Sequence, residues 1–229
     1  LAAGVSHYLK GKNNAIKCFG VEPEGAPSMQ AALSAGEPVE LGQINKFVDG
    51  AAVKKIGATT FQIARQLLDH TRSIPEGKIC TCILELYNKD AIVVEPAGAL
   101  SVAALEFHKE EIKGKKVVCI ISGGNNDIDR MSEIKELSLL YEGYKHYFIV
   151  RFPQRPGALK LFVSEVLGPK DDITRFEFIK KTERERGPAL VGIELNKPED
   201  YQSLIDRMKE YRFDVIEVNK DQTLFEYLV

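Results

Sequence analysis

The sequence has few of the features that place a protein at a membrane, on nucleic acid or outside the cell. Its longest apolar runs fall far short of the roughly 20 residues that cross a bilayer, and no charged segment followed by an apolar one stands at its start. The 31 Lys and Arg are scattered among 33 Asp and Glu, so the net charge is -2 and no basic stripe is present. We therefore expect a cytoplasmic protein with no nucleic acid and no membrane as partner.

Cysteine and histidine are also scarce, with four of each. Cys80 and Cys82 form a C-x-C pair without a second pair at zinc spacing, and the histidines never occur two to a helical turn. Most of the cysteines lie in apolar surroundings, where a free thiol packs as a small hydrophobic group. The sequence therefore predicts core cysteines and no metal site.

The first 142 residues alternate between helix-like and strand-like patterns. Strands that alternate with helices form a parallel sheet, so we predict an α/β domain over residues 1–142. The expected helices cover residues 2–10, a segment around Met29 and segments within 59–68, 79–84 and 100–107, and the expected strands cover 15–21, 91–94 and 117–122.

The pattern changes after residue 142. A strand, a helix, two strands, a helix and a strand follow in that order, which is the ferredoxin-like arrangement. We therefore predict a second, α+β domain over residues 143–229. Its expected strands lie at 146–152, 174–178, 191–195 and 213–218, with a charged hairpin at 180–187, helices at 158–166 and 204–211, and an added edge strand at 223–229.

One turn, Ser122-Gly123-Gly124-Asn125, ends an apolar strand-like run abruptly. In a parallel sheet, ligands bind beyond the carboxyl ends of strands, where glycine lets a planar ring approach the backbone and a hydroxyl fixes its orientation. Glu95 follows another expected strand in the same way, so Glu95 and Ser122 can point into one crevice. The alternatives are a plain connection for the turn and helix-capping roles for Ser122 and Glu95.

Four motifs together resemble those of a known family. Gly20–Ala26, Phe47–Val53, Glu95–Leu100 and Ser122–Asn125 occur in the order seen in biosynthetic threonine dehydratases, also called threonine deaminases. The downstream segment resembles the single ACT-like regulatory domain of the shorter biosynthetic form. The resemblance covers essentially the whole chain, and serine racemase and serine dehydratase share parts of the catalytic pattern. It implies part of a fold-type II pyridoxal-phosphate enzyme, tryptophan synthase β-like, followed by a ferredoxin-like ACT-like domain.

The resemblance implies that pyridoxal 5'-phosphate is the cofactor and L-threonine the substrate. The reaction yields 2-oxobutanoate and ammonia, the first step of isoleucine biosynthesis. Ser122 would hydrogen-bond the pyridine nitrogen, and a hydroxyl suits the uncharged form of that nitrogen. The other residues that the resemblance implies at the cofactor are Gly50 through its backbone, Glu95, Gly123 and Asn125 around the ring, and Leu1 with its backbone N–H at the phosphate.

The sequence departs from the family pattern in two places. It contains neither the family's tetraglycine loop nor the Ser-Phe-Lys segment that carries the Schiff-base lysine, and it opens at Leu1 in a helical pattern with no strand or cap before it. We therefore expect the C-terminal part of a longer enzyme, and no catalysis by this chain alone. In serine racemase-like relatives, a carboxylate that matches Glu22 helps to bind a metal together with a second acid downstream. Ser28 stands near the position of that second acid in this sequence. We therefore interpret Glu22 as organising Gly25 and the helix that follows it.

The second domain has two compatible interpretations, an isoleucine sensor and an interface module of a homo-oligomer, a dimer or homotetramer. The turn at Arg155, Pro156, Gly157, Ala158 and Leu159 offers backbone amides at a helix start, which suit the carboxylate of an effector amino acid. Two alternatives to the whole assignment remain open. One is a non-catalytic amino-acid-binding or oligomerisation module, and the other is a serine dehydratase-like or serine racemase-like enzyme.

Overall fold

The computed structural model describes residues 1–178, 186–221 and 223–225. The chain divides into two compact units, Leu1–Ser138 (unit 1) and Leu139–Val229 (unit 2). Each unit has its own hydrophobic core. No helix in the described ranges is long and apolar enough to cross a membrane.

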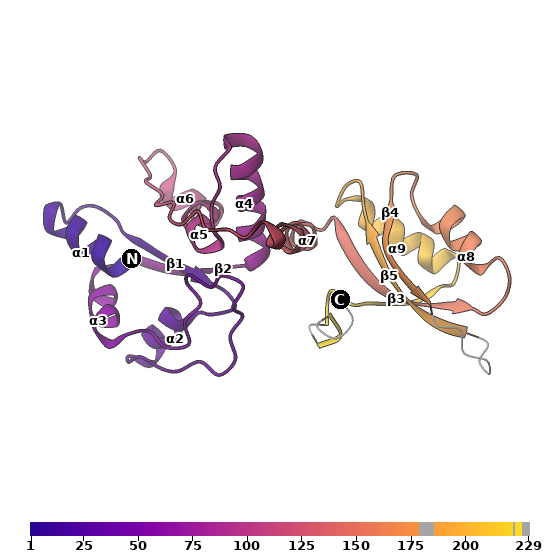
Figure 1. Ribbon diagram of the computed structural model, residues 1–229, viewed down its shortest axis with the longest axis horizontal. Helices are drawn as coiled ribbons and strands as arrows, with labels where there is room; N and C mark the ends of the chain where they lie inside the picture. The colour runs from indigo at the N-terminus through magenta and orange to yellow at the C-terminus, as the bar shows by residue number, and fades with distance from the viewer. Residues whose placement is uncertain (179–185, 222, 226–229) are drawn as a thin grey trace. The chain divides into compact units, whose positions relative to one another are not determined.

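Unit 1 contains helices and a two-stranded parallel sheet (Figure 1). Its strands are β1 (Phe19–Pro23) and β2 (His70–Ile74), which pair with Phe19 opposite His70. Parallel pairing agrees with the predicted class of sheet, although the sequence pattern did not reveal β2. The helices are α1 (Ala2–Lys12), α2 (Ser28–Ala35), α3 (Ala58–Leu67), α4 (Glu76–Asp90), α5 (Pro96–Ala103), α6 (Lys109–Ile112) and α7 (Met131–Tyr141), with short 3-10 turns η1 (Ala104–His108) and η2 (Ile128–Arg130).

The main core of unit 1 forms where α4 and α5 pack on each other. Ile79 and Ile83 of α4 and Ala99 of α5 are almost fully buried there. Cys80 and Cys82 belong to the same cluster, which confirms that these thiols are core groups. Burial raises the pKa of the Cys80 thiol to about 12 and that of Cys82 to about 11, so both thiols stay protonated at neutral pH.

Two strands predicted in unit 1 are not formed. Residues 91–94 and 117–122 have no regular secondary structure. A strand is stabilised by a neighbouring backbone, and no strand in the described part of the chain pairs with either segment. Val117 and Val118 are accordingly 46% and 87% exposed. Both segments are apolar in sequence, but neither has a strand partner in the described chain, so the two predicted strands are wrong for this structure.

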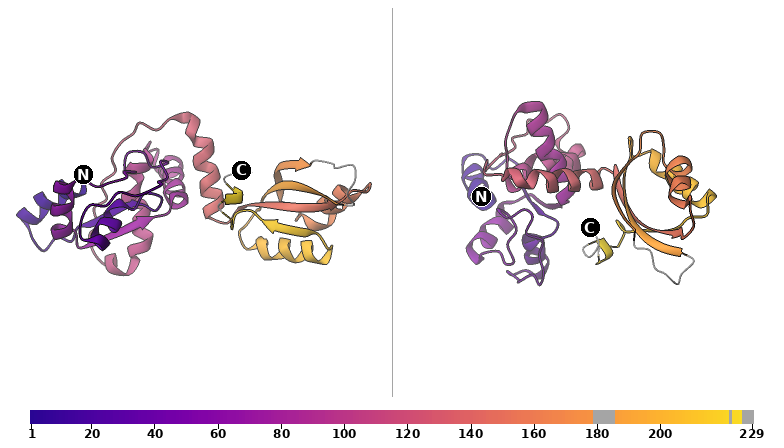
Figure 2. Two further views of the ribbon diagram at one scale, coloured as in Figure 1. Left: turned by 90° about the horizontal axis from the view of Figure 1, so that it is seen from below. Right: turned by 45° about the vertical axis from the view of Figure 1, so that its right-hand side comes forward.

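Unit 2 has the predicted β-α-β-β-α-β order (Figure 2). The strand order in its antiparallel sheet is β4-β5-β3-β6, which is the ferredoxin-like arrangement. The elements are β3 (Lys145–Pro153), α8 (Ala158–Leu161) with a π-helical turn η3 (Phe162–Val166), β4 (Asp172–Phe178), β5 (Arg186–Glu194), α9 (Asp200–Glu210) and β6 (Asp214–Glu217).

One face of this sheet packs against α8, η3 and α9. Phe152 of β3 contacts Phe162 edge-on, with ring centroids 5.2 Å apart. Phe162 and Val166 are buried as predicted, but Leu159 and Val163 are 44% and 47% exposed. The expected apolar face is therefore wrong at Leu159 and Val163. The π-helical turn changes the helical period after Leu161, which explains the exposure of Val163 but not that of Leu159.

The other face of the sheet is partly covered by the end of the chain. Tyr147, Leu190 and Val218 form a small cluster there, against which Leu224 and Phe225 pack. Residues 223–225 are helical, so the strand predicted at 223–229 is wrong at these positions. Residues 226–229 and most of the hairpin predicted at 180–187 lie outside the described residues.

Candidate functional site

Glu95 joins the Ser122-Asn125 turn to the first turn of α5. Its backbone N–H donates to the carbonyl of Gly123 over 3.0 Å. Its own carbonyl accepts the N–H groups of Gly98 at 3.0 Å and Ala99 at 3.2 Å, which begins the helix. Farther along α5, the hydroxyl of Ser101 donates a hydrogen bond to the carbonyl of Ile120 at 2.8 Å. This bond ties the segment just before the turn to α5. Two motifs that are distant in sequence thus meet at Glu95.

Two glycines make this close approach possible. A Cβ on Gly98 would overlap the carbonyl oxygen of Ser122, and a Cβ on Gly123 would overlap the Glu95 carboxylate. Gly123 also has a φ of +72°, in the left-handed region that favours glycine. Packing of the turn on α5 therefore requires glycine at both positions.

Gly50 brings a third motif to the same point. A Cβ on Gly50 would lie 2.9 Å from the Cβ of Ala97 and 3.3 Å from Oε1 of Glu95. The structure therefore brings together Gly50, Glu95, Ser122 and Gly123, as expected of residues that share one site. Their roles toward a cofactor stay a prediction.

The site offers several polar groups without protein partners. The Ser122 hydroxyl and the Glu95 carboxylate form no hydrogen bond or ion pair with any other described residue, and Asn125 is exposed. The buried Oδ1 of Asn126 has no hydrogen-bond partner, while its amide nitrogen lies 3.9 Å from the sulfur of Met131. A buried polar atom without a partner is costly. This end of the site therefore suits a ligand with polar groups.

Arg130, which the sequence analysis missed, fixes the loop before Gly50. Its guanidinium donates to the carbonyl of Phe47 at 2.6 Å and lies 4.8 Å from the centre of the Phe47 ring. It also lies 4.0 Å from the carboxylate of Asp49. No local sequence pattern identifies this role, because Phe47 and Asp49 are distant from Arg130 in the chain.

Glu22 organises α2, as the sequence suggested. The Glu22 carboxylate accepts hydrogen bonds from the backbone N–H groups of Met29 at 2.8 Å and Gln30 at 2.9 Å. Burial raises the pKa of this carboxyl, and the two hydrogen bonds oppose that rise. The N–H of Gly25 donates instead to Glu76 at 2.8 Å. Across the described ranges, no group of three or more His, Cys, Asp or Glu residues is arranged to hold a metal ion.

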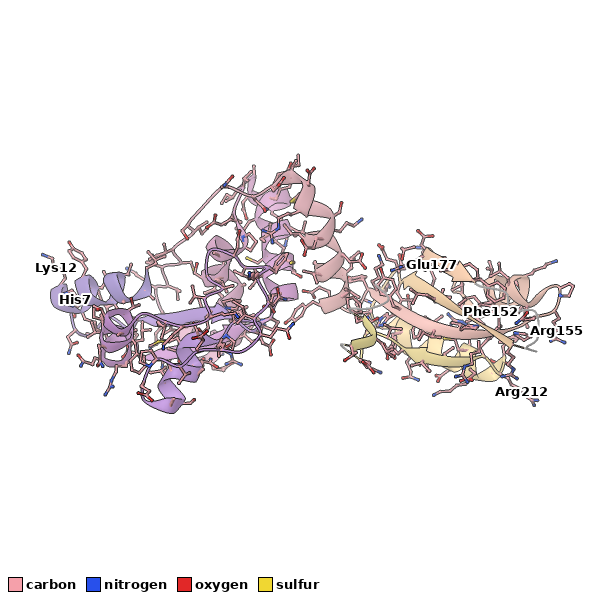
Figure 3. All side chains as sticks on the ribbon, turned by 60° about the horizontal axis from the view of Figure 1, so that its bottom comes forward. His7, Lys12, Phe152, Arg155, Glu177 and Arg212 are labelled. Atoms are coloured by element: carbon pink, nitrogen blue, oxygen red, sulfur yellow. The ribbon has the colours of Figure 1, made fainter. Side chains whose placement is uncertain are left out.

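Two other predicted positions lie apart from this group. Leu1 is 78% exposed, and no backbone hydrogen bond within the described residues joins it to Glu95 or Gly123. In unit 2, the turn containing Arg155 (Figure 3) already uses two of its amides. The backbone N–H of Arg155 donates to the carbonyl of Pro153 at 2.9 Å, and the backbone N–H of Ala158 donates to the carbonyl of Arg155 at 3.4 Å. The phosphate and effector roles of these positions stay predictions.

Residues 1–123, more than half of the chain, match the family model of pyridoxal-phosphate dependent enzymes. The chain belongs to this family. Residues 136–228 match the model of the C-terminal regulatory domain of threonine dehydratase. The family's cofactor is pyridoxal phosphate, as the resemblance implied.

Two relatives with similar sequences are biosynthetic L-threonine dehydratases. The chain is 58% identical over 229 residues to the biosynthetic L-threonine dehydratase of Bacillus subtilis, and 56% identical to that of Halalkalibacterium halodurans. All of this chain is covered in each case, but only 54% and 55% of the relatives, so the chain spans about half their length.

A solved relative supports the same family membership. The processed form of threonine deaminase isoform 2 from Solanum lycopersicum aligns with a TM-score of 0.56 at 34% identity. The alignment covers 60% of this chain and 41% of that structure. Together with the family models, this confirms the fold class, part of a fold-type II pyridoxal-phosphate enzyme followed by a regulatory domain.

Proposed function

We propose that the complete protein deaminates L-threonine to 2-oxobutanoate and ammonia with pyridoxal phosphate, and that this chain supplies one wall of the cofactor site. The observation that carries the proposal is the convergence of Gly50, Glu95 and the Ser122-Asn125 turn on one point. It is supported by 58% identity to a biosynthetic L-threonine dehydratase. The chemistry that pyridoxal phosphate supplies when bound is an electron sink.

The residues around Glu95 fit this cofactor. In the proposal, the Ser122 hydroxyl donates a hydrogen bond to the pyridine nitrogen and keeps its own proton. The nitrogen stays uncharged, because a carboxylate in place of the hydroxyl would stabilise the protonated form. The exposed backbones of Gly50 and Gly123 let a flat ring approach closely. Glu95 and Asn125 bind and orient polar groups at the edge of the ring.

The proposal places the phosphate at the start of α1. The backbone N–H groups in the first turn of α1 have no partners within the helix, and Leu1 stands at its N-cap. The helix dipole adds a favourable field for an anion at that end. Leu1 therefore contributes its own N–H to the phosphate in the complete protein.

We further propose that residues 1–229 alone are inactive and that isoleucine regulates the complete protein. The sequence lacks the Ser-Phe-Lys segment that carries the reactive lysine in the family. Regulation through unit 2 is supported by the match of residues 136–228 to a regulatory domain. Isoleucine acts only if it binds one quaternary state of the cytoplasmic homo-oligomer more tightly than another. The turn from Arg155 to Leu159 is one candidate effector position.

The test is turnover of L-threonine and L-serine by the complete protein and by residues 1–229. The expected result is 2-oxobutanoate from L-threonine with the complete protein only. Ser122→Ala should lower kcat about tenfold, the effect of losing one hydrogen bond of about 1.4 kcal/mol. Ser34→Ala, in an exposed position on α2, is the matched control and should leave kcat unchanged. Turnover of L-serine without L-threonine would reject the substrate assignment.

A further inference from the structure

Three hydrogen bonds join the turn at Gly25 to residues 47–50, the Gly50 loop. The carboxylate of Glu76, at the start of α4, accepts the backbone N–H of Gly25 at 2.8 Å. The carbonyl of Gly25 accepts the backbone N–H of Asn45 at 2.9 Å. The side-chain oxygen of Asn45 then accepts the backbone N–H of Phe47 at 2.8 Å. These bonds form a continuous chain from α4 to the Gly50 loop.

Gly25 packs closely between the two side chains of this chain of bonds. A Cβ at position 25 would overlap both the Cβ of Asn45 and the carboxylate of Glu76. The bond to Glu76 has a carboxylate as its acceptor, and hydrogen bonds to a charged acceptor are stronger than those between neutral groups. Glu76 is therefore the anchor of the chain, and Asn45 is the residue that reaches the loop.

Phe47 is held at both of its backbone polar groups. Asn45 binds its N–H, and the guanidinium of Arg130 binds its carbonyl at 2.6 Å. Phe47 is only 6% exposed, and the next residue, Val48, is fully buried. The protein itself therefore fixes the direction in which the chain enters Gly50.

We propose that Asn45 and Glu76 are positioning residues, which hold the Gly50 loop in the conformation that receives pyridoxal phosphate. Neither residue touches the cofactor, and the motif at residues 20–26 acts on the site through them. The inference rests on the proposed function for the identity of the cofactor. Loss of the tether lowers the fraction of molecules whose loop is ready to bind, and the apparent Kd rises by the inverse of that fraction. The bound form stays the same, and so does kcat at saturating cofactor.

Titration of the complete apoprotein with pyridoxal phosphate measures this effect. Asn45→Ala should raise the Kd about tenfold, equivalent to about 1.4 kcal/mol. Excess cofactor should restore its kcat, with an unchanged KM for L-threonine. Asn45→Asp keeps an oxygen acceptor at the same place and should recover most of the affinity.

Asn13→Ala is the matched control for this titration. The side-chain oxygen of Asn13 accepts the N–H of Ala15 at 2.9 Å, which is the same bond to the residue two positions ahead, at an exposed position after α1. Its loss should leave the Kd unchanged. A Kd raised equally in Asn13→Ala and Asn45→Ala would overturn the proposal.

A double-mutant cycle tests whether the bonds act as one chain. Glu76→Ala removes the anchor of Gly25 and should also raise the Kd. Combined with Asn45→Ala, it should raise the Kd no further than the larger single effect, because both changes break the same chain. Single effects that multiply in the double variant would overturn the chain from Glu76. Glu85→Ala, an exposed change on α4 that removes a surface pair with Lys89, should leave the Kd unchanged.

Amide hydrogen exchange in the 229-residue chain reports on the loop without any cofactor. Asn45→Ala should speed exchange in a peptide that covers residues 46–52, and Asn45→Asp should not. A uniform rise in exchange across unit 1, with a lower Tm, would assign Asn45 a merely structural role and overturn the proposal.

The two measurements separate this inference from the proposed function. If the unchanged complete protein binds pyridoxal phosphate and Asn45→Ala binds it equally well, the inference fails and the proposed function stands. If the unchanged protein does not bind pyridoxal phosphate, the proposed function fails, and exchange at residues 46–52 decides the role of Asn45. Faster exchange in Asn45→Ala then supports its hold on the loop, and unchanged exchange rejects it.

Discussion

The backbone N–H of Glu95 donates to the carbonyl of Gly123 over 3.0 Å, and this bond seats the Ser122-Asn125 turn on the start of α5. The two residues also meet through the Glu95 side chain, whose carboxylate occupies the space that a Cβ on Gly123 would need. Glycine at position 123 is therefore a requirement of packing as well as of ligand approach.

Gly123→Ala should distort the turn. The left-handed backbone alone costs about 1–2 kcal/mol for a residue with a Cβ, and the overlap with Glu95 adds to that cost. We expect a lower Tm of unit 1 and weaker retention of pyridoxal phosphate by the complete protein. Thermal unfolding and cofactor absorbance after dialysis measure the two effects.

Gly124→Ala is the control for this change. A Cβ there would lie 3.5 Å from the carbonyl oxygen of Val93, which is ordinary contact. Its Tm and cofactor retention should stay close to those of the unchanged protein. Equal losses in both variants would show that the turn tolerates no side chain at all, and that Glu95 is not the cause.

Arg130→Ala should loosen the loop that carries Gly50. The loss of the hydrogen bond to Phe47 and of the ring contact should cost about 1–3 kcal/mol, typical of a bond from a charged donor. Cofactor affinity, measured by titrating the complete apoprotein, should fall with it. Lys135→Ala, at an exposed position on α7, is the control, and a similar loss in that variant would contradict the role of Arg130.

Local sequence patterns predicted the elements of this chain better than their contacts. Apolar patterns predicted β3, β4 and β5, and apolar residues of these strands belong to the core of unit 2 or pack against it. The runs at 91–94 and 117–122 have the same signal, but they lack a paired neighbour in the described chain. Strand formation depends on such a partner, which a local pattern does not specify.

The candidate site was predictable only in part. The motifs around Gly50, Glu95 and Ser122 were recognisable from their resemblance to a family. The role of Gly98 was not, because it depends on a carbonyl oxygen of Ser122 that approaches from elsewhere in the chain.

Asp69 should stabilise unit 1 in a pH-dependent way. Its carboxylate accepts hydrogen bonds from Lys10 at 2.7 Å, the backbone N–H of Cys18 at 2.8 Å and Lys17 at 2.9 Å. These bonds, with that of Lys10 the strongest, hold the pKa of the carboxyl well below its ordinary range. Asp69→Asn should lower the stability of unit 1 by about 1–3 kcal/mol at neutral pH.

The direction of this pH dependence follows from the lowered pKa. A carboxyl with a depressed pKa in the folded state stabilises fully above its unfolded pKa of about 3.9, and loses that effect as the pH falls toward the folded value. The difference in Tm between Asp69→Asn and the unchanged chain should therefore shrink below about pH 4. Asp90→Asn, at an exposed position, should show no such trend, and a constant difference for Asp69→Asn would contradict the account.

The cysteines should differ in reactivity. Burial raises the pKa of Cys80 to about 12 and of Cys82 to about 11, so neither forms the reactive thiolate near neutral pH. Iodoacetamide should modify the half-buried Cys119 first, and Cys80 and Cys82 only after unfolding. Mass spectrometry of peptides from folded and urea-treated chain measures this. Rapid modification of Cys80 in the folded chain would contradict the buried core described for unit 1.

The central claim, that Ser122 faces the pyridine nitrogen of the cofactor, is tested most directly by ¹⁵N NMR of the complete protein loaded with ring-labelled pyridoxal phosphate. The account predicts the chemical shift of an uncharged, hydrogen-bonded pyridine nitrogen, which moves in Ser122→Ala and stays unchanged in Ser34→Ala. The shift of a protonated pyridinium, or one that does not respond to Ser122→Ala, would contradict it.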